Sequence, residues 1–160
     1  MKKSCFFVLL AFMGFMSLGA ATVSVVVVET GLPSDNGCTP SASIWESGMM
    51  DAFFEAGHIV SNAPCTQINS PSGALPPELN QDFNQARMGG VDFFVLVILN
   101  HPEDKPPDFK EVIIRVFRVS SGVLLHETSV SGRTWGNGED EFLAARQNAG
   151  KLVSRFSLKD

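Results

Sequence analysis

Residues 91–99 have the sequence VDFFVLVIL, the most apolar stretch that follows the amino-terminal segment of this 160-residue chain. A short run rich in β-branched and aromatic residues favours a strand that is buried on both faces of a sheet. Residues 23–28 form a second run of this kind, VSVVVV. These two runs predict that a largely buried sheet lies at the centre of the fold.

A helix is predicted between the strand at 23–28 and the next strand. Ser43 followed by Glu46 is a capping-box pattern, in which each side chain bonds an otherwise unpaired backbone N–H. Gly57 is expected to end this helix in a left-handed cap. Apolar residues recur between these ends at the spacing of one helical face: Trp45, Met49, Ala52, Phe53 and Ala56.

The remaining segments continue the alternation of strands and helices. We expect, in order, a strand at 58–62, a loop at 63–77, a helix at 78–88, the strand at 91–99, a loop at 100–108, strands at 110–119 and 123–130, and a helix at 139–156. The turn SSG at 120–122 is a hairpin signal. The order β-α-β-α-β-β-β-α predicts an α+β fold, in which helices pack on a mixed five-stranded sheet with early parallel crossovers and a late antiparallel hairpin. Residues 22–160 would form this single domain.

The first 21 residues have the three parts of a secretory signal peptide. Two lysines precede an almost wholly apolar run at 6–16, and small residues follow at 19–21. The alternative is a membrane anchor, which needs about 20 apolar residues to cross a bilayer, whereas only residues 5–18 are available. We therefore expect cleavage of residues 1–21 and a periplasmic or secreted protein with no transmembrane segment after processing.

Charge excludes one class of partner. Removal of residues 1–21 takes two of the 12 basic residues and none of the 17 acidic ones, which leaves ten against 17 and a net charge of −7. A nucleic-acid partner needs a basic stripe that displaces counterions from the phosphates. The cations that remain are scattered along the chain, so we expect no nucleic-acid binding.

Two cysteines, Cys38 and Cys65, remain once Cys5 leaves with the signal peptide. Disulfides persist outside the cytoplasm, so a single bridge is predicted, with a loop-closure stabilisation of about 3–4 kcal/mol. The strand order supports the bridge, because parallel strands of a right-handed strand–helix–strand unit end at the same sheet edge and each cysteine follows one of them. A metal site is the alternative, with His58 as the only further ligand nearby in sequence. A redox-active pair is not favoured, because the cysteines lack the Cys-x-x-Cys spacing.

Three histidines are the best candidates for catalysis or metal binding: His58, His101 and His126. None has a second ligand at zinc-site spacing. His101 could act as a base beside Glu103 and Asp104, although solvated charges in a proline-rich loop account for the same residues. No nucleophile elbow and no phosphate-binding glycine loop occur. We predict no catalytic, cofactor-binding or metal-binding residue and no cofactor, and we keep a hydrolase as the third hypothesis.

The segment WGNGEDE at 135–141 has two interpretations. Its oxygen-bearing side chains could hold calcium, but they lack the alternating spacing of a calcium loop. A helix cap at Asn137, with acidic residues in the following turn, accounts for the same sequence. We therefore expect a helix start there.

Recognition is better supported than catalysis. Loops carry function when a rigid scaffold positions them, and the predicted disulfide would tie the loop at 30–40 to the loop at 63–77. A third candidate is the loop at 100–108. The candidate partner-binding residues are Trp135, His101, Glu103 and Asp104. Trp135 is included because an exposed tryptophan is a common contact residue, although packing beneath the sheet is an equal alternative.

Three further stretches resemble a fold shared by the curli channel protein CsgG, the amino-terminal domain of TolB and the penicillin-binding-protein activator LpoB. They are the valine strand with the helix end FEAGH at 54–58, the strand entry ARMGGVDFF at 86–94, and the hairpin VFRVSSGVL at 116–124. The resemblance implies a bacterial envelope protein whose domain docks onto other proteins.

The chain also departs from these proteins. It has no long alternating hairpins for a membrane barrel, no residues left for a propeller, and no cysteine after the small-residue segment for lipid attachment. We therefore predict a non-catalytic protein-binding or assembly accessory domain, with a partner in the envelope or in a secretion or flagellar assembly. The alternative is a small exported binding protein for a hydrophobic or lipid ligand held between the sheet and its helices.

Overall fold

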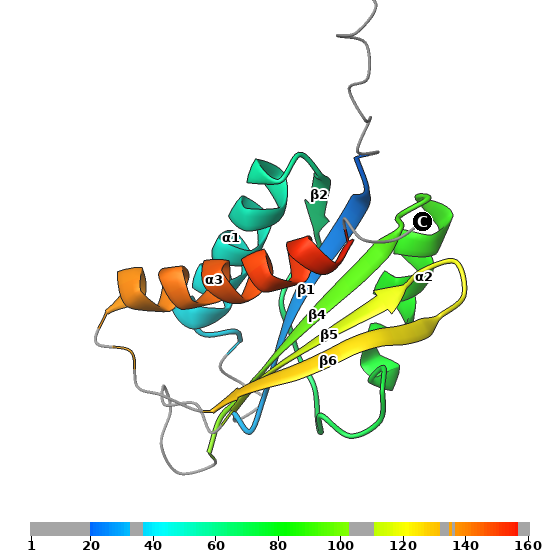
Figure 1. The fold of residues 1–160 in the computed structure, drawn as a ribbon. Coiled ribbons are helices and arrows are strands. Elements are labelled where there is room, and N and C mark those ends of the chain that lie inside the picture. The colour runs from blue at the N-terminus through cyan, green and yellow to red at the C-terminus, as the bar shows by residue number, and fades with distance from the viewer. Residues whose placement is uncertain (1–19, 33–36, 103–110, 132–134, 136, 157–160) are drawn as a thin grey trace, which may run out of the picture.

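The computed structural model describes residues 20–32, 37–102, 111–131, 135 and 137–156, so the predicted signal segment lies almost wholly outside the described residues. The described residues form one mixed sheet with helices on both faces (Figure 1). The elements are β1 (Thr22–Thr30), α1 (Pro40–Glu55), β2 (Ile59–Asn62), β3 (Thr66–Gln67), the 3-10 turn η1 (Pro77–Leu79), α2 (Asn80–Met88), β4 (Phe93–Asn100), β5 (Glu111–Arg118), β6 (Val123–Ser131) and α3 (Gly138–Phe156).

The two apolar runs lie side by side at the centre of the sheet, in the strand order β2-β1-β4-β5-β6. β1 pairs with β4 in parallel from Val23 opposite Phe93 to Thr30 opposite Asn100, and β4, β5 and β6 are antiparallel. The predicted α+β fold and its mixed sheet are therefore confirmed. The two-residue strand β3 is an addition, because it pairs with β1 from within the predicted loop at 63–77.

Alternate residues of β1 face two separate cores, as the period of a strand requires. Val23, Val25 and Val27 face α1 and α3, whereas Val26 and Val28 face η1 and α2. The predicted face of α1 is confirmed at its large residues, because Trp45, Met49 and Phe53 are fully buried; Ala56, at its end, is exposed.

α1 and α3 cross closely at Gly48. A Cβ atom added to Gly48 would lie 2.7 Å from the carbonyl oxygen of Phe142 and 2.8 Å from the Cβ of Ala145. Real Cβ atoms do not approach other atoms this closely, so a side chain at residue 48 would push the two helices apart. Glycine at this position lets α3 cover the same sheet face as α1.

The predicted start of the first helix is wrong. α1 begins at Pro40, with Thr39 in the N-cap position, so Ser43 and Glu46 lie inside the helix and form no capping box. Proline suits the first helical position because its fixed φ is already helical and its missing N–H would lack a helical partner there. At the other end Gly57 has φ +85°, which confirms the left-handed cap.

The other two helix starts differ in how well they were predicted. The second helix was expected from residue 78, but residues 77–79 form the 3-10 turn and α2 begins at Asn80. The cap of α3 is confirmed, because Asn137 Oδ1 accepts a hydrogen bond from the Asp140 N–H at 2.9 Å.

Candidate functional site

A buried carboxylate lies at the carboxyl end of β1. Glu29 follows the valine run directly and is 0% exposed, and its backbone lies between the paired strands β3 and β4. Strand alternation directs its side chain to the same face as Val25 and Val27, towards the start of α1. A charge in such a place is costly unless it is hydrogen-bonded.

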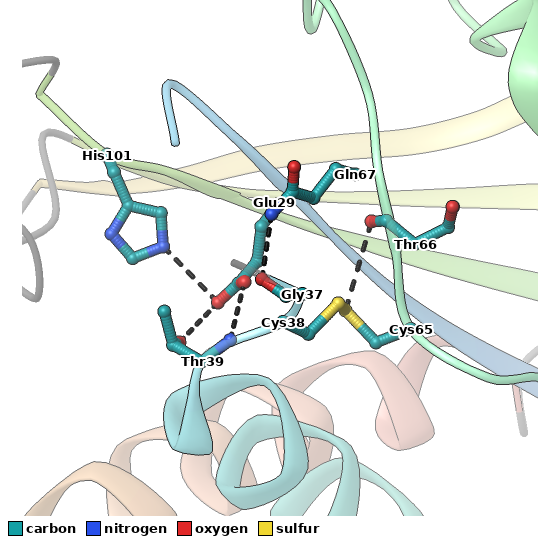
Figure 2. The surroundings of a disulfide bond; sticks show 8 residues. All are labelled: Glu29, Gly37, Cys38, Thr39, Cys65, Thr66, Gln67 and His101. Atoms are coloured by element: carbon teal, nitrogen blue, oxygen red, sulfur yellow. Dashed lines mark hydrogen bonds and ion pairs between the residues drawn. A yellow bond between two sulfur atoms is a disulfide. The ribbon is translucent and has the colours of Figure 1, made fainter. Parts of the chain in front are cut away.

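Two residues from other segments satisfy the Glu29 carboxylate (Figure 2). The Thr39 N–H donates to Oε2 at 2.8 Å, and the Thr39 hydroxyl donates to Oε1 in a short hydrogen bond. His101 Nε2 lies 3.3 Å from Oε1, and the side chain of His101 is also 0% exposed. This explains why Thr39 makes no side-chain cap bond to α1: its hydroxyl bonds Glu29 instead.

Two opposing effects act on the Glu29 carboxyl. Burial raises its pKa, and the hydrogen bonds from His101 and Thr39 lower it by more. The net pKa lies below the ordinary value of a glutamate, so this carboxyl is ionised at neutral pH. Glu29 therefore acts as a fixed negative charge to which two segments bond.

The predicted disulfide is present beside this carboxylate. Cys38 and Cys65 are bonded with an S–S distance of 2.00 Å, and each lies in the segment that follows one of the parallel strands β1 and β2. Gln67 Nε2 adds a hydrogen bond of 2.7 Å to the carbonyl of Gly37. One Glu29 carboxylate oxygen and the two sulfur atoms lie within 4.8 Å of one another.

The start of the loop at 100–108 and the segment after β3 are also bonded to the carboxyl end of β1. The His101 N–H donates to the Thr30 carbonyl at 2.9 Å, and the Ile68 N–H donates to the Glu29 carbonyl at 2.8 Å. Gly31 has φ +84°, and a Cβ added there would lie 2.2 Å from the His101 carbonyl oxygen, so only glycine fits. We call Glu29, Cys38, Thr39, Cys65 and His101 the loop platform, because they join the starts of all three candidate loops and the end of the first.

A second buried carboxylate, Glu141, lies near the start of α3. The Ser41 hydroxyl donates to its Oε2 at 3.1 Å, whereas its Oε1 has no hydrogen-bond partner among the described residues. Burial raises the pKa of Glu141 above the ordinary value, and the side chains of Ser41 and Trp45 oppose this shift only in part. Glu141 is thus a weakly satisfied counterpart of Glu29.

The predicted site residues have different outcomes. Trp135 is half-buried and packs edge-on against the core residue Trp45, with ring centroids 5.7 Å apart. His101 is buried under the loops and does not offer its ring to solvent. Glu103 and Asp104 lie outside the described residues. The roles of these four residues in partner binding stay predictions.

Sequence reasoning missed Glu29, the carboxylate that lies beside His101. The signal was present: a single acidic residue follows a buried valine strand, at the sheet edge where the strand order already placed Cys38 and Cys65. The alternative metal ligand, His58, lies at the opposite end of β1, where its Nδ1 accepts the Ala21 N–H at 3.3 Å.

The fold of this chain is similar to that of several bacterial proteins with solved structures. PelC from Paraburkholderia phytofirmans, solved as a dodecamer, is 18% identical over 88% of this chain and 90% of that chain, with a TM-score of 0.51. The LpoB C-terminal domain from Escherichia coli is 13% identical (72% and 84% covered; TM-score 0.45), and TolB from Acinetobacter baumannii is 12% identical (88% and 28% covered; TM-score 0.41). No family model and no curated protein sequence matches the chain.

LpoB and TolB, whose fold the sequence was predicted to resemble, are thus among the solved structures that are similar to this chain. A second prediction is confirmed. The resemblance requires the strands at 23–28 and 91–99 to lie in one sheet, and they pair directly. None of the helices among the described residues combines the length and the apolar composition of a membrane span.

Proposed function

We propose that this chain is an exported, non-catalytic domain that binds a protein of the cell envelope, or of a secretion or flagellar assembly. The observation that carries the proposal is the loop platform, in which a disulfide and the buried Glu29 carboxylate hold three loop starts at one end of the sheet. Rigid loops bind with a smaller loss of conformational entropy than free ones, so such an end suits protein recognition.

The likeness to PelC supports an assembly role. PelC has this fold and was solved as a dodecamer, so the fold is compatible with association of many identical chains. A second copy of this chain is therefore one possible partner, which light scattering of the purified chain would reveal as a multiple of the chain mass.

The alternative, a hydrophobic or lipid ligand between the sheet and its helices, has less support. That space is filled by the two clusters of buried side chains, one under α1 and α3 and the other under η1 and α2. An enzymatic role also has less support, because the buried His101 contacts a carboxylate that is already satisfied by Thr39.

Site-specific photo-cross-linking in the native envelope tests the proposal. A photoreactive residue replaces Ser70, which is exposed in the loop after β3, and a matched probe replaces Met88, which is 81% exposed at the opposite end of the sheet. We expect a discrete cross-linked product from residue 70 and none from residue 88. Equal products from both probes, or a product from residue 88 alone, would contradict a partner site at the loop platform.

A further inference from the structure

We propose that reduction of the Cys38–Cys65 disulfide creates a site for a divalent cation of the zinc class, with Cys38, Cys65 and Glu29 as its protein ligands. This inference does not depend on the proposed protein-binding function. In the oxidised chain the two sulfur atoms are bonded to each other and offer no thiolate, so the site belongs to the reduced chain alone.

The ligand atoms are already gathered. The sulfur atoms of both cysteines and one carboxylate oxygen of Glu29 lie within 4.8 Å of one another. Two zinc–sulfur bonds of about 2.3 Å at a tetrahedral angle place the sulfurs about 3.8 Å apart. The Cα atoms of the cysteines are 6.3 Å apart, so side-chain rotation can open the sulfurs to this distance while the backbone stays in place.

The chemistry of the three groups favours such an ion. Two thiolates and a carboxylate would repel one another when ionised, and a divalent cation removes that repulsion. Thiolate ligands select zinc over magnesium or calcium, which prefer oxygen. Glu29 supplies a buried carboxylate, whereas both cysteines are only partly buried, so solvent reaches them.

The surroundings of Glu29 match those of a ligand held in position. Ligating carboxylates are commonly fixed by hydrogen bonds from neighbouring groups. Thr39 bonds both oxygens of Glu29, and His101 Nε2 lies 3.3 Å from one of them (Figure 2). His101 is therefore a positioning residue in this proposal, and water occupies the fourth position on the ion.

The conversion between the two states balances. A dithiol reductant supplies two electrons and two protons, becomes a disulfide itself, and leaves Cys38 and Cys65 as thiols. The cation then displaces both thiol protons to solvent as the two sulfur–metal bonds form. The reverse step needs a disulfide oxidant, which takes two electrons from the thiolates and two protons from solvent and becomes a dithiol, while the Cys38–Cys65 bond re-forms and the ion is released.

Cobalt titration of the reduced, purified chain is the test. Co²⁺ is a spectroscopic substitute for Zn²⁺, and we expect one ion per chain with the intense visible bands of tetrahedral coordination and a sulfur-to-metal charge-transfer band. Zn²⁺ should displace the Co²⁺ and abolish these bands. X-ray absorption of the zinc form should give two sulfur neighbours and two lighter ones. The oxidised chain should bind neither ion at this site.

Variants separate the ligand from its support. His101→Gln should weaken metal binding about 10- to 100-fold and leave both sulfur neighbours of the zinc in place. Glu29→Gln should remove one light ligand from the zinc and weaken binding at least as much. The matched control is Glu127→Gln, because Glu127 pairs with Arg115 on the opposite face of the sheet and should leave binding unchanged.

Several results would overturn the proposal. The first is that the reduced wild-type chain binds no Co²⁺, and the second is that the bound Co²⁺ shows octahedral bands. The third is that a folded Glu29→Gln variant binds the ion with wild-type affinity and has the same atoms around the zinc. If Glu29→Gln does not fold, the sulfur count of the wild-type zinc form decides. If reduction unfolds the wild-type chain, zinc should restore its circular-dichroism spectrum, and failure to do so would also overturn the proposal.

Discussion

The carboxyl end and the amino end of β1 are held by different interactions. At the carboxyl end a disulfide, a buried carboxylate and a buried histidine join three loop starts. At the amino end the Thr22 N–H donates to Asp92 Oδ2 at 2.8 Å in an exposed hydrogen bond, and the apolar side chains of Phe54, Met88 and Val123 are exposed. The disulfide and the fully buried carboxylate thus lie at the end with the candidate binding loops.

This contrast shows how a few buried bonds can position loops that have no large hydrophobic cluster of their own. Three segments that are far apart in sequence contribute the five residues of the loop platform, and each of these residues bonds another one that is buried or half-buried. Buried charge-assisted hydrogen bonds are directional, so they fix where a loop begins as well as how stable it is. The amino end has the backbone pairing of the strands and two side-chain acceptors, His58 for the Ala21 N–H and Asp92 for the Thr22 N–H.

Among the variants at the two ends of β1, removal of the disulfide should cause the largest loss in the free energy of unfolding. The double variant Cys38→Ser with Cys65→Ser should lose about 3–4 kcal/mol of the free energy of unfolding, because loop closure then costs entropy on folding. Chemical denaturation of the oxidised wild type and of the variant measures the loss. A loss below about 1 kcal/mol would mean that the covalent link adds little to the carboxyl end.

Neutralisation of Glu29 should cause the second largest loss in the free energy of unfolding. Glu29→Gln keeps the shape but removes the charge that Thr39 and His101 bond, and we expect a loss of about 2–3 kcal/mol at pH 7 in chemical denaturation. Glu127→Gln, which changes an exposed partner of Arg115, is the control and should lose less.

The stabilisation by the Glu29 charge should depend on pH in a definite direction. The pKa of Glu29 is lower in the folded chain than in the unfolded one, so its charge stabilises the fold above the unfolded pKa. That stabilisation is lost as the pH falls through the folded pKa. The stabilities of the wild type and Glu29→Gln should therefore converge in acid, and a difference that stays constant from neutral to acid pH would contradict the role of the charge.

At the amino end, Asp92→Ala should have a smaller effect. The variant removes the acceptor of the Thr22 N–H, and because this bond is exposed we expect a loss of about 1 kcal/mol or less in the same denaturation measurement. A loss as large as that of Glu29→Gln would erase the contrast between the two ends.

Glu141→Gln should have the smallest effect and the opposite sign. Burial raises the pKa of Glu141, so its ionised form opposes folding at neutral pH, and a neutral amide removes that opposition. We expect a small gain in the free energy of unfolding at pH 7 and none in acid, where the wild-type carboxyl is already protonated. A clear loss at pH 7 would show that the ionised carboxylate is stabilising in its place beside Ser41.

Much of the fold could be predicted from local sequence. The runs at 23–28 and 91–99 are apolar enough to identify the buried strands, and the glycine at 122 marks the hairpin. The start of α1 was misplaced, because Thr39 bonds Glu29, a residue ten positions earlier, and this contact has no local pattern. The strand β3 was missed, because two residues among prolines carry no periodicity.

The candidate site was only half predicted. Strand order was enough to pair Cys38 with Cys65, since both follow parallel strands. The contact between Glu29 and His101 spans 72 residues and depends on the register of β1 against β4, which composition and periodicity do not determine. The sequence therefore predicted Glu103 and Asp104 as the neighbours of His101, whereas the structure places the buried carboxylate of Glu29 beside it.

Hydrogen exchange tests most directly whether Glu29 holds the loop platform. In the oxidised wild type the amides of Thr39, Ile68 and His101 should exchange slowly, because each is hydrogen-bonded at the carboxyl end of β1. Glu29→Gln should speed up exchange at these three amides and leave that of Asp92, whose N–H bonds the Thr22 carbonyl at the other end, unchanged. Equal exchange of the Thr39 amide in wild type and variant would contradict this account.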